Sequence, residues 1–449
     1  MVTKPTTDVL SVIGLGKLGS PLLACLASKG FLTIGVDVNP EVVSAVLNGK
    51  APVFEPGLDT LLAENGENIS ATTDIRTAVV DSSITFIIVP TPSDESGGFS
   101  LRFIQPTCSA VGEALRSLDR YHLVVLTSTV LPGSTAGAVR EMLETNSRKV
   151  CGKDFGLCYS PEFIALGSVI RDMLNPDFVL IGESDKRAGE QLEGIYKRLC
   201  DNNPPIVHMS LVNAEVTKLA VNTYVTTKIS FANMLARICE NLPGADVDVV
   251  TEALGKDKRI GSKYLKGAVG YGGPCFPRDN QALSFVAREI GLTATLAEAT
   301  DALNREQVPY LVRLIMKYIP DGGRVGILGL TYKPDTNVTE ESQGVLLAEE
   351  LRKEGIPVSV YDPGALLNDL IKEFKGYHSS ASLEECIAAS DVIVITTPWE
   401  EFKNLDPGLL ERKGSKRVII DCWRILNPES ISRYAEYRAL GIGYQSDKL

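Results

Sequence analysis

The chain has 449 residues, 44% of them hydrophobic and 22% charged, a composition typical of soluble proteins with two or three domains. Its formal net charge of −11 at pH 7 argues against binding to nucleic acids or anionic membranes, although a local basic pocket could still hold an anionic substrate. No apolar run reaches the roughly 18 residues of a membrane span and residues 1–8 lack a signal-peptide pattern, so we expect a cytoplasmic protein.

The first predicted element is a dinucleotide-binding βαβ unit. A short apolar strand leads into the pattern Gly14-x-Gly16-x-x-Gly19, a helix follows, and a second strand over residues 31–38 carries Asp37. The glycines let the backbone approach a pyrophosphate, which faces the helix N-terminus. A carboxylate at Asp37 can bind both ribose hydroxyls and would repel a 2′-phosphate, which predicts NAD rather than NADP. The expected cofactor residues of this unit are Gly14, Gly16, Lys17, Leu18, Gly19 and Asp37.

Strands and helices continue to alternate after this unit. Apolar strands are predicted at residues 84–89, 123–126 and 155–159, and each ends in a loop marked by polar residues, Pro or Gly. This order is typical of a parallel sheet covered on both faces, where ligands bind at the carboxyl ends of the strands. Any one polar residue there could simply cap a loop. Four together favour a site, and they are Thr91, Ser128, Thr129 and Glu162.

Residues 212–241 form the longest helical pattern, which ends before Pro243. About 28 helical residues would measure ~42 Å, enough to join two domains or to pair with a copy in a dimer. Lys218 and Asn222 are four residues apart and share one face, while a solvated ion pair between Lys218 and Glu215 is the alternative. A buried apolar stripe is predicted at Val212, Val216, Leu219, Tyr224, Phe231, Leu235 and Ile238.

The nine cysteines are scattered without paired spacing, which predicts reduced thiols, and the three His are far apart, which argues against a zinc site or a His-centred triad. One thiol stands out. Residues 267–279 hold three Gly and two Pro within eight positions, so they form a loop of fixed shape that presents Cys275. A thiolate is a strong nucleophile, and Asp279 is expected in the first turn of a helix beginning near Pro277. The alternative is a buried, inert Cys.

A second α/β unit follows helical residues that extend to about Tyr318. It has a strand before Lys333, a helix over residues 342–354, and strands at 358–361, 392–396 and 418–421, but no GxGxxG, so we expect it to bind something other than the dinucleotide. The predicted fold is α/β, with two doubly wound Rossmann-like domains joined by a central helical domain. The predicted domain boundaries are 1–205, 206–318 (which includes the Cys loop) and 319–449.

Taken together, these motifs resemble the UDP-glucose/GDP-mannose dehydrogenase family, the nucleotide-sugar 6-dehydrogenases. The resemblance covers nearly the whole chain, and it implies an N-terminal NAD domain, a central domain that dimerises and a C-terminal domain that binds the nucleotide of the sugar. Its motifs are Gly14-x-Gly16-x-x-Gly19, Thr91 with Pro92, Ser128 to Gly133, Pro161 to Phe163, Lys218 with Asn222, Asp257 to Gly261, Gly272 to Asp279, and Lys333.

The resemblance also implies the chemistry. In this family the C6 alcohol of the sugar is oxidised to an aldehyde, Cys275 would hold the aldehyde as a thiohemiacetal, a second NAD yields a thioester, and water releases the acid. Lys218 and Asn222 would stabilise the oxyanion, while Asp279, Glu162 and Thr129 would hold or deprotonate the water. The expected substrate residues are Phe163, Lys218, Asn222, Arg259, Tyr271, Gly272, Gly273, Tyr332, Lys333 and Arg424, with Arg259 reaching the substrate of a neighbouring subunit.

Three positions depart from the family pattern. Glu340 stands where relatives usually carry an Arg that helps to hold the cofactor, Leu166 replaces an acidic residue of some UDP-glucose members, and Pro274 replaces Ser.

UDP-glucose oxidation to UDP-glucuronate by a homodimer is the expected function, with a UDP-N-acetylhexosamine (GlcNAc or ManNAc) as the alternative substrate. A one-step hydroxyacid dehydrogenase would need no Cys275, and a non-catalytic nucleotide-sugar sensor has only Glu340 in its favour.

Overall fold

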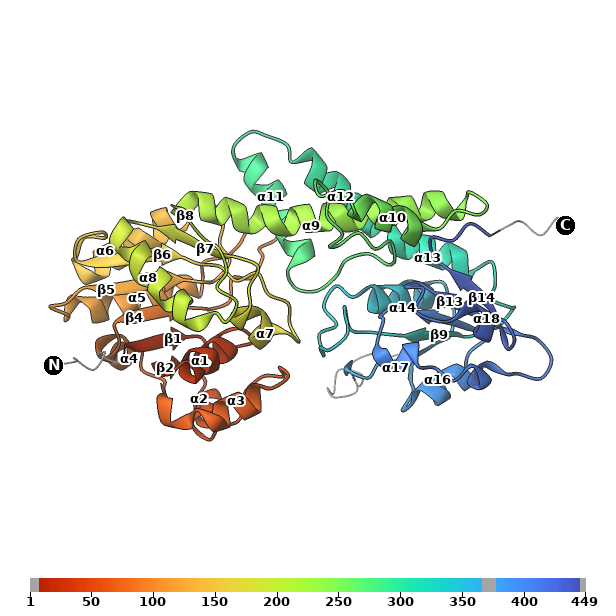
Figure 1. Cartoon of the computed structure of the whole chain (residues 1–449), viewed down its shortest axis with the longest axis horizontal. Coiled ribbons are helices and arrows are strands. Elements are labelled where there is room, and N and C mark those ends of the chain that lie inside the picture. Colours follow the sequence, from red (N-terminus) through yellow and green to blue (C-terminus); the bar gives the residue numbers. More distant parts are fainter. Residues whose placement is uncertain (1–7, 366–376, 445–449) are drawn as a thin grey trace. The chain divides into compact units, whose positions relative to one another are not determined.

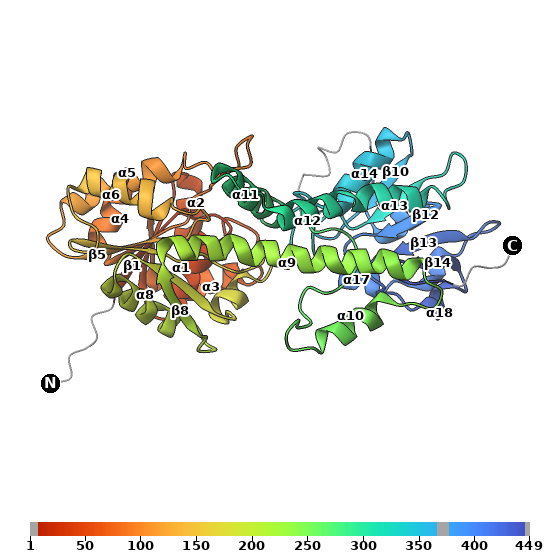
Figure 2. The same cartoon turned by 90° about the horizontal axis from the view of Figure 1, so that it is seen from above.

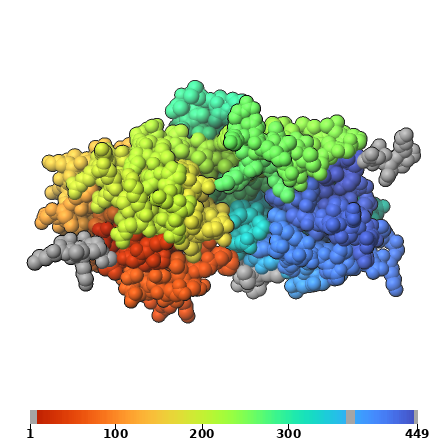
Figure 3. Space-filling model, in the orientation of Figure 1, coloured from red at the N-terminus to blue at the C-terminus, as the bar shows by residue number. Residues whose placement is uncertain are grey.

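The computed structural model describes residues 8–365 and 377–444, and the chain divides into two compact units, Met1–Ala220 and Val221–Leu449 (Figure 1). Each unit is built around one sheet with helices on it. The two units are described separately below. In Figure 3 their surfaces are coloured along the sequence, and the orange segment of the first unit around residues 40–65 lies at its surface.

The first unit contains an eight-stranded sheet in the order β3-β2-β1-β4-β5-β6-β7-β8. Neighbouring strands are parallel except β6 and β7, which pair antiparallel through Tyr159 and Gly182, so the expected parallel sheet does not extend across this pair. The connection at residues 160–178 returns the chain beside β6 in the opposite direction. The strands are β1 Val9–Ile13, β2 Leu32–Val36, β3 Ile69–Thr72, β4 Ile84–Ile87, β5 His122–Leu126, β6 Phe155–Tyr159, β7 Val179–Glu183 and β8 Ile206–Ser210.

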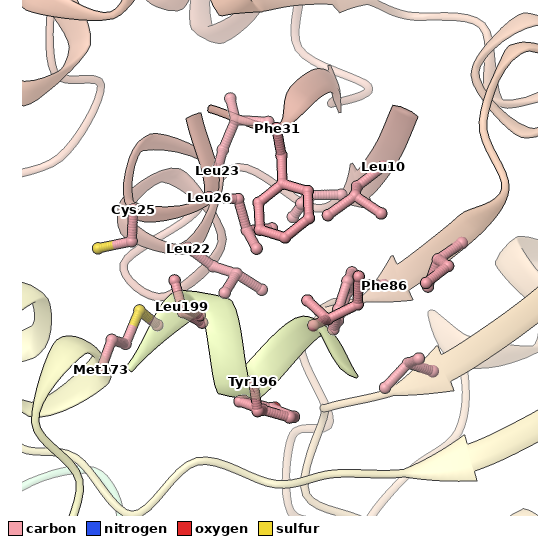
Figure 4. Packing of buried hydrophobic residues seen from close by; sticks show 14 of the residues in the cluster. Leu10, Leu22, Leu23, Cys25, Leu26, Phe31, Phe86, Met173, Tyr196 and Leu199 are labelled. Carbon is pink, nitrogen blue, oxygen red and sulfur yellow. The ribbon is translucent and has the colours of Figure 1, made fainter. Parts of the chain in front are cut away.

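Helices cover both faces of this sheet, because successive strand residues point to opposite sides. In β5, Leu123 and Val125 join a core cluster with α1, α3, α7 and α8, whereas Val124 and Leu126 join a second cluster with α4, α5 and α6. Figure 4 shows part of the first cluster. The helices are α1 Gly19–Ser28, α2 Pro40–Leu47, α3 Leu58–Glu64, α4 Ile75–Asp81, α5 Ile104–Arg116, α6 Arg140–Ser147, α7 Val169–Leu174 and α8 Lys186–Leu199, with helical turns at Gly66–Asn68 and Thr135–Val139.

Buried polar side chains of β1, β4 and β5 form a chain of hydrogen bonds across this sheet. Ser11 Oγ lies 2.8 Å from Thr85 Oγ1, which lies 2.8 Å from His122 Nε2. All three residues are fully buried. Burial lowers the pKa of His122 from 6.5 to about 3, so this imidazole is neutral in the folded chain.

The long helix α9, Leu211–Glu240, has 30 residues, close to the predicted range (Figure 2). The predicted buried stripe is wrong for most of its length. Val212, Val216, Tyr224, Phe231 and Ile238 are between 42% and 63% exposed, and of the predicted set only Leu219 is fully buried. Small side chains face inward instead, because they let neighbouring elements approach the helix closely. Those fully or nearly fully buried are Ala214, Thr226, Ser230, Ala232 and Ala236.

The second unit contains a six-stranded, wholly parallel sheet in the order β11-β10-β9-β12-β13-β14, with helices before and between its strands. This confirms the second doubly wound domain and the α/β fold class. The strands are β9 Val325–Leu328, β10 Val358–Tyr361, β11 His378–Ser379, β12 Val392–Ile395, β13 Arg417–Asp421 and β14 Ala435–Ala439. The helices are α10 Val247–Gly255, α11 Phe276–Glu289, α12 Thr295–Arg305, α13 Gln307–Ile315, α14 Gln343–Lys353, α16 Leu383–Ala388, α17 Glu400–Lys403 and α18 Pro428–Ile431, with a turn at Pro407–Leu410.

Both sheets begin with the same close contact between the first strand and the first helix. Gly14 and Gly329 have φ of +95° and +115°, a region that favours glycine. A Cβ on Gly19 would lie 1.7 Å from the Gly14 carbonyl oxygen, and a Cβ on Gly344 would lie 1.9 Å from that of Gly329. The paired glycines are five residues apart in the first unit and fifteen in the second (19 − 14 and 344 − 329). The second unit therefore repeats the turn with ten more residues in it, which is why no GxGxxG is found there.

The acidic residue that follows the second strand differs between the two turns. Asp362, after β10, is fully buried. Its Oδ2 accepts hydrogen bonds from the amides of Leu330 and Thr331 at 2.7 and 2.9 Å, and its Oδ1 accepts one from Gly364 at 2.8 Å. In this unit the carboxylate is thus used to hold the turn itself.

Candidate active site

The glycine turn of the first unit has room for a pyrophosphate. A Cβ on Gly14 would lie 2.2 Å from the Ile88 carbonyl oxygen, so the chain passes tightly at this point. A Cβ on Gly16 would meet no protein atom within 4 Å, so the backbone faces open space at the start of α1. The N-terminus of α1 has no side-chain cap. Open space before an uncapped helix N-terminus suits a phosphate group, so the residues present fit the dinucleotide that the sequence predicts.

Asp37 follows β2 at the same edge of the sheet, and its side chain is only partly buried. Its Oδ2 accepts a hydrogen bond from Leu15 N at 2.9 Å and its Oδ1 accepts one from Asn39 N at 2.9 Å. Two backbone amides therefore fix the orientation of the carboxylate. Partial exposure leaves its remaining lone pairs accessible to hydroxyl groups, which is the arrangement a ribose requires.

Three predicted residues join the ends of β4 and β5. Thr91 Oγ1 donates to the carbonyl oxygen of Thr129 at 2.7 Å. Ser128 Oγ accepts from Val89 N at 2.9 Å and donates to Val89 O at 2.7 Å. These hydroxyls brace the edge at which the sequence places the cofactor, and their direct contact with NAD stays a prediction.

The loop after β6 brings Glu162, Phe163 and Lys218 together. Lys218 Nζ donates to the Glu162 carbonyl oxygen at 2.7 Å and lies 4.8 Å from the centre of the Phe163 ring. Burial raises the pKa of the Glu162 carboxyl to about 7, although the Lys218 ammonium and a hydrogen bond from Tyr196 act in the opposite direction. A carboxyl group with this pKa can take up and release a proton near neutral pH, as a general base must.

This loop is anchored by Glu55, a residue that the sequence analysis missed. Glu55 is only 6% exposed, and its two carboxylate oxygens accept hydrogen bonds from Gly167 N at 2.8 Å and Val169 N at 2.7 Å. A carboxylate at the N-terminus of α7 satisfies amides that the helix leaves without partners. The only signal in the sequence is an acidic residue between apolar residues and Pro56.

The alternative of a solvated ion pair between Lys218 and Glu215 is wrong. Glu215 is fully buried, and its two oxygens accept hydrogen bonds from Gly133 N at 2.6 Å and Thr135 N at 2.7 Å. Lys218 is 8% exposed and points to the loop after β6. The two charged residues share one turn of α9 and serve different neighbours.

In the second unit, Cys275 immediately precedes α11, which begins at Phe276. Its side chain is exposed, whereas the other eight cysteines are buried, so the expectation of a buried thiol in the alternative interpretation is wrong, and its reactivity stays a prediction. Asp279 lies in the first turn as predicted, is 1% exposed, and donates its amide hydrogen to the Cys275 carbonyl oxygen at 2.8 Å. Asn222 Nδ2 donates to Asp279 Oδ2 at 2.6 Å, and Arg278 Nε lies 3.7 Å from Oδ1.

The glycines before Cys275 bring this loop against residues 332–341. A Cβ on Gly272 would lie 2.2 Å from the Glu341 carbonyl oxygen, and one on Gly273 would lie 2.7 Å from the Tyr332 ring. Gly273 N donates to the Glu340 carbonyl oxygen at 3.0 Å. Tyr271 is buried, with its amide donating to Asn304 Oδ1 at 2.8 Å. Four predicted substrate residues, Tyr271, Gly272, Gly273 and Tyr332, are therefore neighbours in one unit, with Lys333 next in the chain.

Two predicted arginines form ion pairs with residues outside this group. The Arg259 side chain is 88% exposed and pairs with Asp257 at 2.6 Å. The Arg424 side chain is 7% exposed and makes two 2.8 Å contacts with Asp248, and it also donates to Gly267 O at 2.6 Å. Arg424 thus braces α10 and the start of the Cys loop, and the substrate roles of both arginines stay predictions.

Neither a membrane-spanning helix nor a metal cluster occurs in the part of the chain that the structure describes. No helix there combines the necessary length and apolar character, and no three His, Cys, Asp or Glu side chains gather as metal ligands would.

Three domains of one known protein family match successive parts of the chain. The NAD binding domain of the UDP-glucose/GDP-mannose dehydrogenase family matches residues 8–200, its central domain matches 212–306, and its UDP binding domain matches 326–428. The chain belongs to the UDP-glucose/GDP-mannose dehydrogenase family. It is accordingly an NAD-dependent nucleotide-sugar dehydrogenase, with NAD as cofactor and a UDP-binding domain after the central helices.

Similar proteins within the family differ in the sugar that their names carry. The chain is 35% identical over 421 residues to UDP-glucose 6-dehydrogenase of Haloferax volcanii, covering 93% of this chain and 97% of the relative. It is 34% identical over 410 residues to GDP-mannose 6-dehydrogenase of Pseudomonas aeruginosa, covering 88% and 93%. The solved UDP-glucose dehydrogenase of Pyrobaculum islandicum is 31% identical, with a TM-score of 0.89 over 98% of this chain and 100% of that one.

Proposed function

We propose that this member of the UDP-glucose/GDP-mannose dehydrogenase family oxidises the C6 alcohol of UDP-glucose to the carboxylate of UDP-glucuronate. The observation that carries the proposal is Cys275, whose exposed thiol stands at the start of α11 on a loop shaped by glycines. The choice of UDP-glucose is supported by the 35% identity to the Haloferax volcanii enzyme and by the TM-score of 0.89 to the Pyrobaculum islandicum enzyme.

The reaction proceeds through a covalent bond to Cys275. The C6 alcohol loses a proton and a hydride, and the Cys275 sulfur adds to the resulting aldehyde to form a thiohemiacetal. Loss of a second hydride leaves a thioester, water attacks the thioester carbon, and the thiolate departs. The sum is RCH₂OH + 2 NAD⁺ + H₂O → RCOO⁻ + 2 NADH + 3 H⁺. The cofactor supplies only the capacity to accept a hydride at each oxidation.

The polar groups of the first unit serve the oxyanion and the water. Lys218 is a buried ammonium held by the Glu162 carbonyl group, so it keeps a fixed position while it stabilises a developing negative charge. Glu162, with its pKa near 7, takes the proton of the attacking water, and Thr129 stands at the end of β5 to orient that water.

In the second unit, a hydrogen bond to Asp279 fixes the Asn222 amide group, and α11 begins directly after Cys275. Asn222 donates one amide hydrogen to Asp279, so its side chain is fixed before it acts on an oxyanion. Asp279 is buried in the first turn of α11, where its carboxylate favours the positive end of the helix. The loop of Tyr271, Gly272 and Gly273 holds the sugar, beside Tyr332 and Lys333.

We further propose that the enzyme is a homodimer and that residues 206–318 form its dimerising domain. Within the second unit, α9 exposes Tyr224, Phe231 and Ile238, which are 63%, 44% and 47% accessible. Of these three, Ile238 also lines a pocket of about 410 Å³, together with Met234, Arg237, Asn241, Leu242, Leu303 and Gln307. Light scattering should give twice the chain mass for the wild type and the chain mass for Phe231→Asp.

The stoichiometry of the reaction tests the proposed function. NADH formation should be measured with UDP-glucose, UDP-galactose, UDP-GlcNAc, UDP-ManNAc and GDP-mannose. UDP-glucose should give the highest kcat/KM, two NADH per sugar and no free aldehyde. Cys275→Ala should abolish acid formation while calorimetry shows unchanged nucleotide-sugar binding, and Cys239→Ala, which removes a buried thiol, is the matched control. One NADH per sugar, or acid formation by Cys275→Ala, would reject the mechanism.

A further inference from the structure

Tyr196, on α8, reaches the Glu162 carboxyl group from the core of the first unit. Its ring lies in the cluster with α1, and the residue is only 5% exposed (Figure 4). Its hydroxyl oxygen lies 2.8 Å from Ser160 Oγ and 3.4 Å from Glu162 Oε1. Ser160 Oγ in turn donates to the Leu180 carbonyl oxygen at 2.9 Å. A chain of hydrogen bonds thus runs from Glu162 through two hydroxyl groups to the backbone of β7.

Counting hydrogens shows that this chain has two arrangements. Tyr196 and Ser160 each carry one hydroxyl hydrogen, and the Leu180 carbonyl oxygen can only accept. When Glu162 is ionised, Tyr196 donates to the carboxylate and Ser160 donates to Tyr196, so the Leu180 carbonyl oxygen does not receive the Ser160 hydrogen. When Glu162 is protonated, the carboxyl group donates to Tyr196, Tyr196 donates to Ser160, and Ser160 donates to Leu180. In each arrangement both hydroxyl hydrogens have an acceptor, so the chain can follow the protonation of Glu162.

We propose that Tyr196 is a positioning residue for Glu162, and that the chain Tyr196–Ser160 reverses its donor direction when Glu162 takes up the proton of the attacking water. The inference rests on the proposed function, in which Glu162 is the base for that water.

The surroundings keep the chain in place. Ser160 N donates to the Leu126 carbonyl oxygen at 2.9 Å, which fixes the serine at the end of β6. The other titratable groups that interact electrostatically with the Glu162 carboxylate in this unit are Lys218 on α9, Cys25 on α1 and Cys200 after α8. Lys218 favours the ionised carboxylate whichever way the hydroxyls point, so only Tyr196 and Ser160 can link hydroxyl direction to protonation.

Two variants should shift the acid limb of the kcat–pH profile in opposite directions. Tyr196→Phe removes the donor to the carboxylate, so the apparent pKa should rise by roughly half a unit to one unit, which lowers the rate on that limb about 3- to 10-fold. Ser160→Ala removes the acceptor that Tyr196 needs when Glu162 is protonated, so the apparent pKa should fall. KM for the nucleotide sugar should stay unchanged in both, and Tyr159→Phe, a buried tyrosine in the opposite cluster, should shift nothing.

A measurement without catalysis separates this inference from the proposed function. The fall in Tm caused by Tyr196→Phe should be larger at pH 8 than at pH 5, because the lost donor matters most to the ionised carboxylate. In the Glu162→Gln background the fall should be equal at both pH values. If this coupling appears while no nucleotide sugar is oxidised, the proposed function fails and the role of Tyr196 stands. Equal falls at both pH values in the native background, or shifts in the same direction for Tyr196→Phe and Ser160→Ala, would overturn the inference.

Discussion

Replacement of Glu55 by Gln should loosen the loop that carries Glu162. In the folded chain each Glu55 oxygen accepts one backbone amide hydrogen, at 2.8 and 2.7 Å, in a site that is 6% exposed. A Gln keeps one of these acceptors and turns an NH₂ group toward the other amide, which leaves a buried donor without a partner. A lost charge-assisted bond with an unsatisfied donor costs about 2–3 kcal/mol. For a unit of this size that is a fall in Tm of about 5–10 °C.

The assay is thermal unfolding followed by far-UV circular dichroism, with steady-state kinetics on the same preparations. Glu64→Gln at the exposed end of α3 is the matched control and should change stability by less than about 0.5 kcal/mol. Glu55→Gln should also lower kcat, because residues 160–168 would no longer hold Glu162 in one position. Equal Tm values for the two variants would refute the reasoning that Glu55 anchors this loop.

Asp37, Lys218 and His122 can each be tested by one substitution. Asp37→Ala should narrow the preference for NAD over NADP, and equal kcat/KM for both cofactors in the native enzyme would contradict the role of Asp37. Lys218→Ala should lower kcat about 100-fold or more with little change in nucleotide-sugar binding, measured by kinetics and calorimetry. His122 has a folded pKa near 3 and an unfolded pKa near 6.5, so the unfolded chain binds the proton more readily, and stability should fall as pH drops from about 6.5 to 3, by up to about 4 kcal/mol. His122→Gln should lack this part of the slope in urea unfolding.

The sequence predicted well those elements whose signal is local. Continuous apolar runs placed β6 at Phe155–Tyr159 and β10 at Val358–Tyr361 with the expected bounds, because such runs fit only a strand buried on both faces. The Gly and Pro spacing also identified the loop before Cys275, because these residues exclude regular helix and strand there.

Features that depend on distant contacts were missed. The direction of β7 is set by how the chain returns after β6, and the inward face of α9 is set by close neighbours rather than by apolar spacing. Glu55 and Tyr196 lie more than thirty residues from Glu162 (162 − 55 and 196 − 162), so no motif links them to it. Only the folded chain shows that both hold the same loop.

The repeated turn at the start of the two sheets has a thermodynamic consequence. In the second unit the Asp362 carboxylate satisfies the amides of Leu330 and Thr331, as Asp37 satisfies the amide of Leu15 in the first unit. In the first unit the uncapped start of α1 depends on an anion from outside, and Gly16 leaves room for it. A ligand that binds only the folded chain stabilises it by mass action. Binding of the cofactor therefore adds to the stability of the first unit, and this contribution grows as the cofactor concentration rises above its Kd.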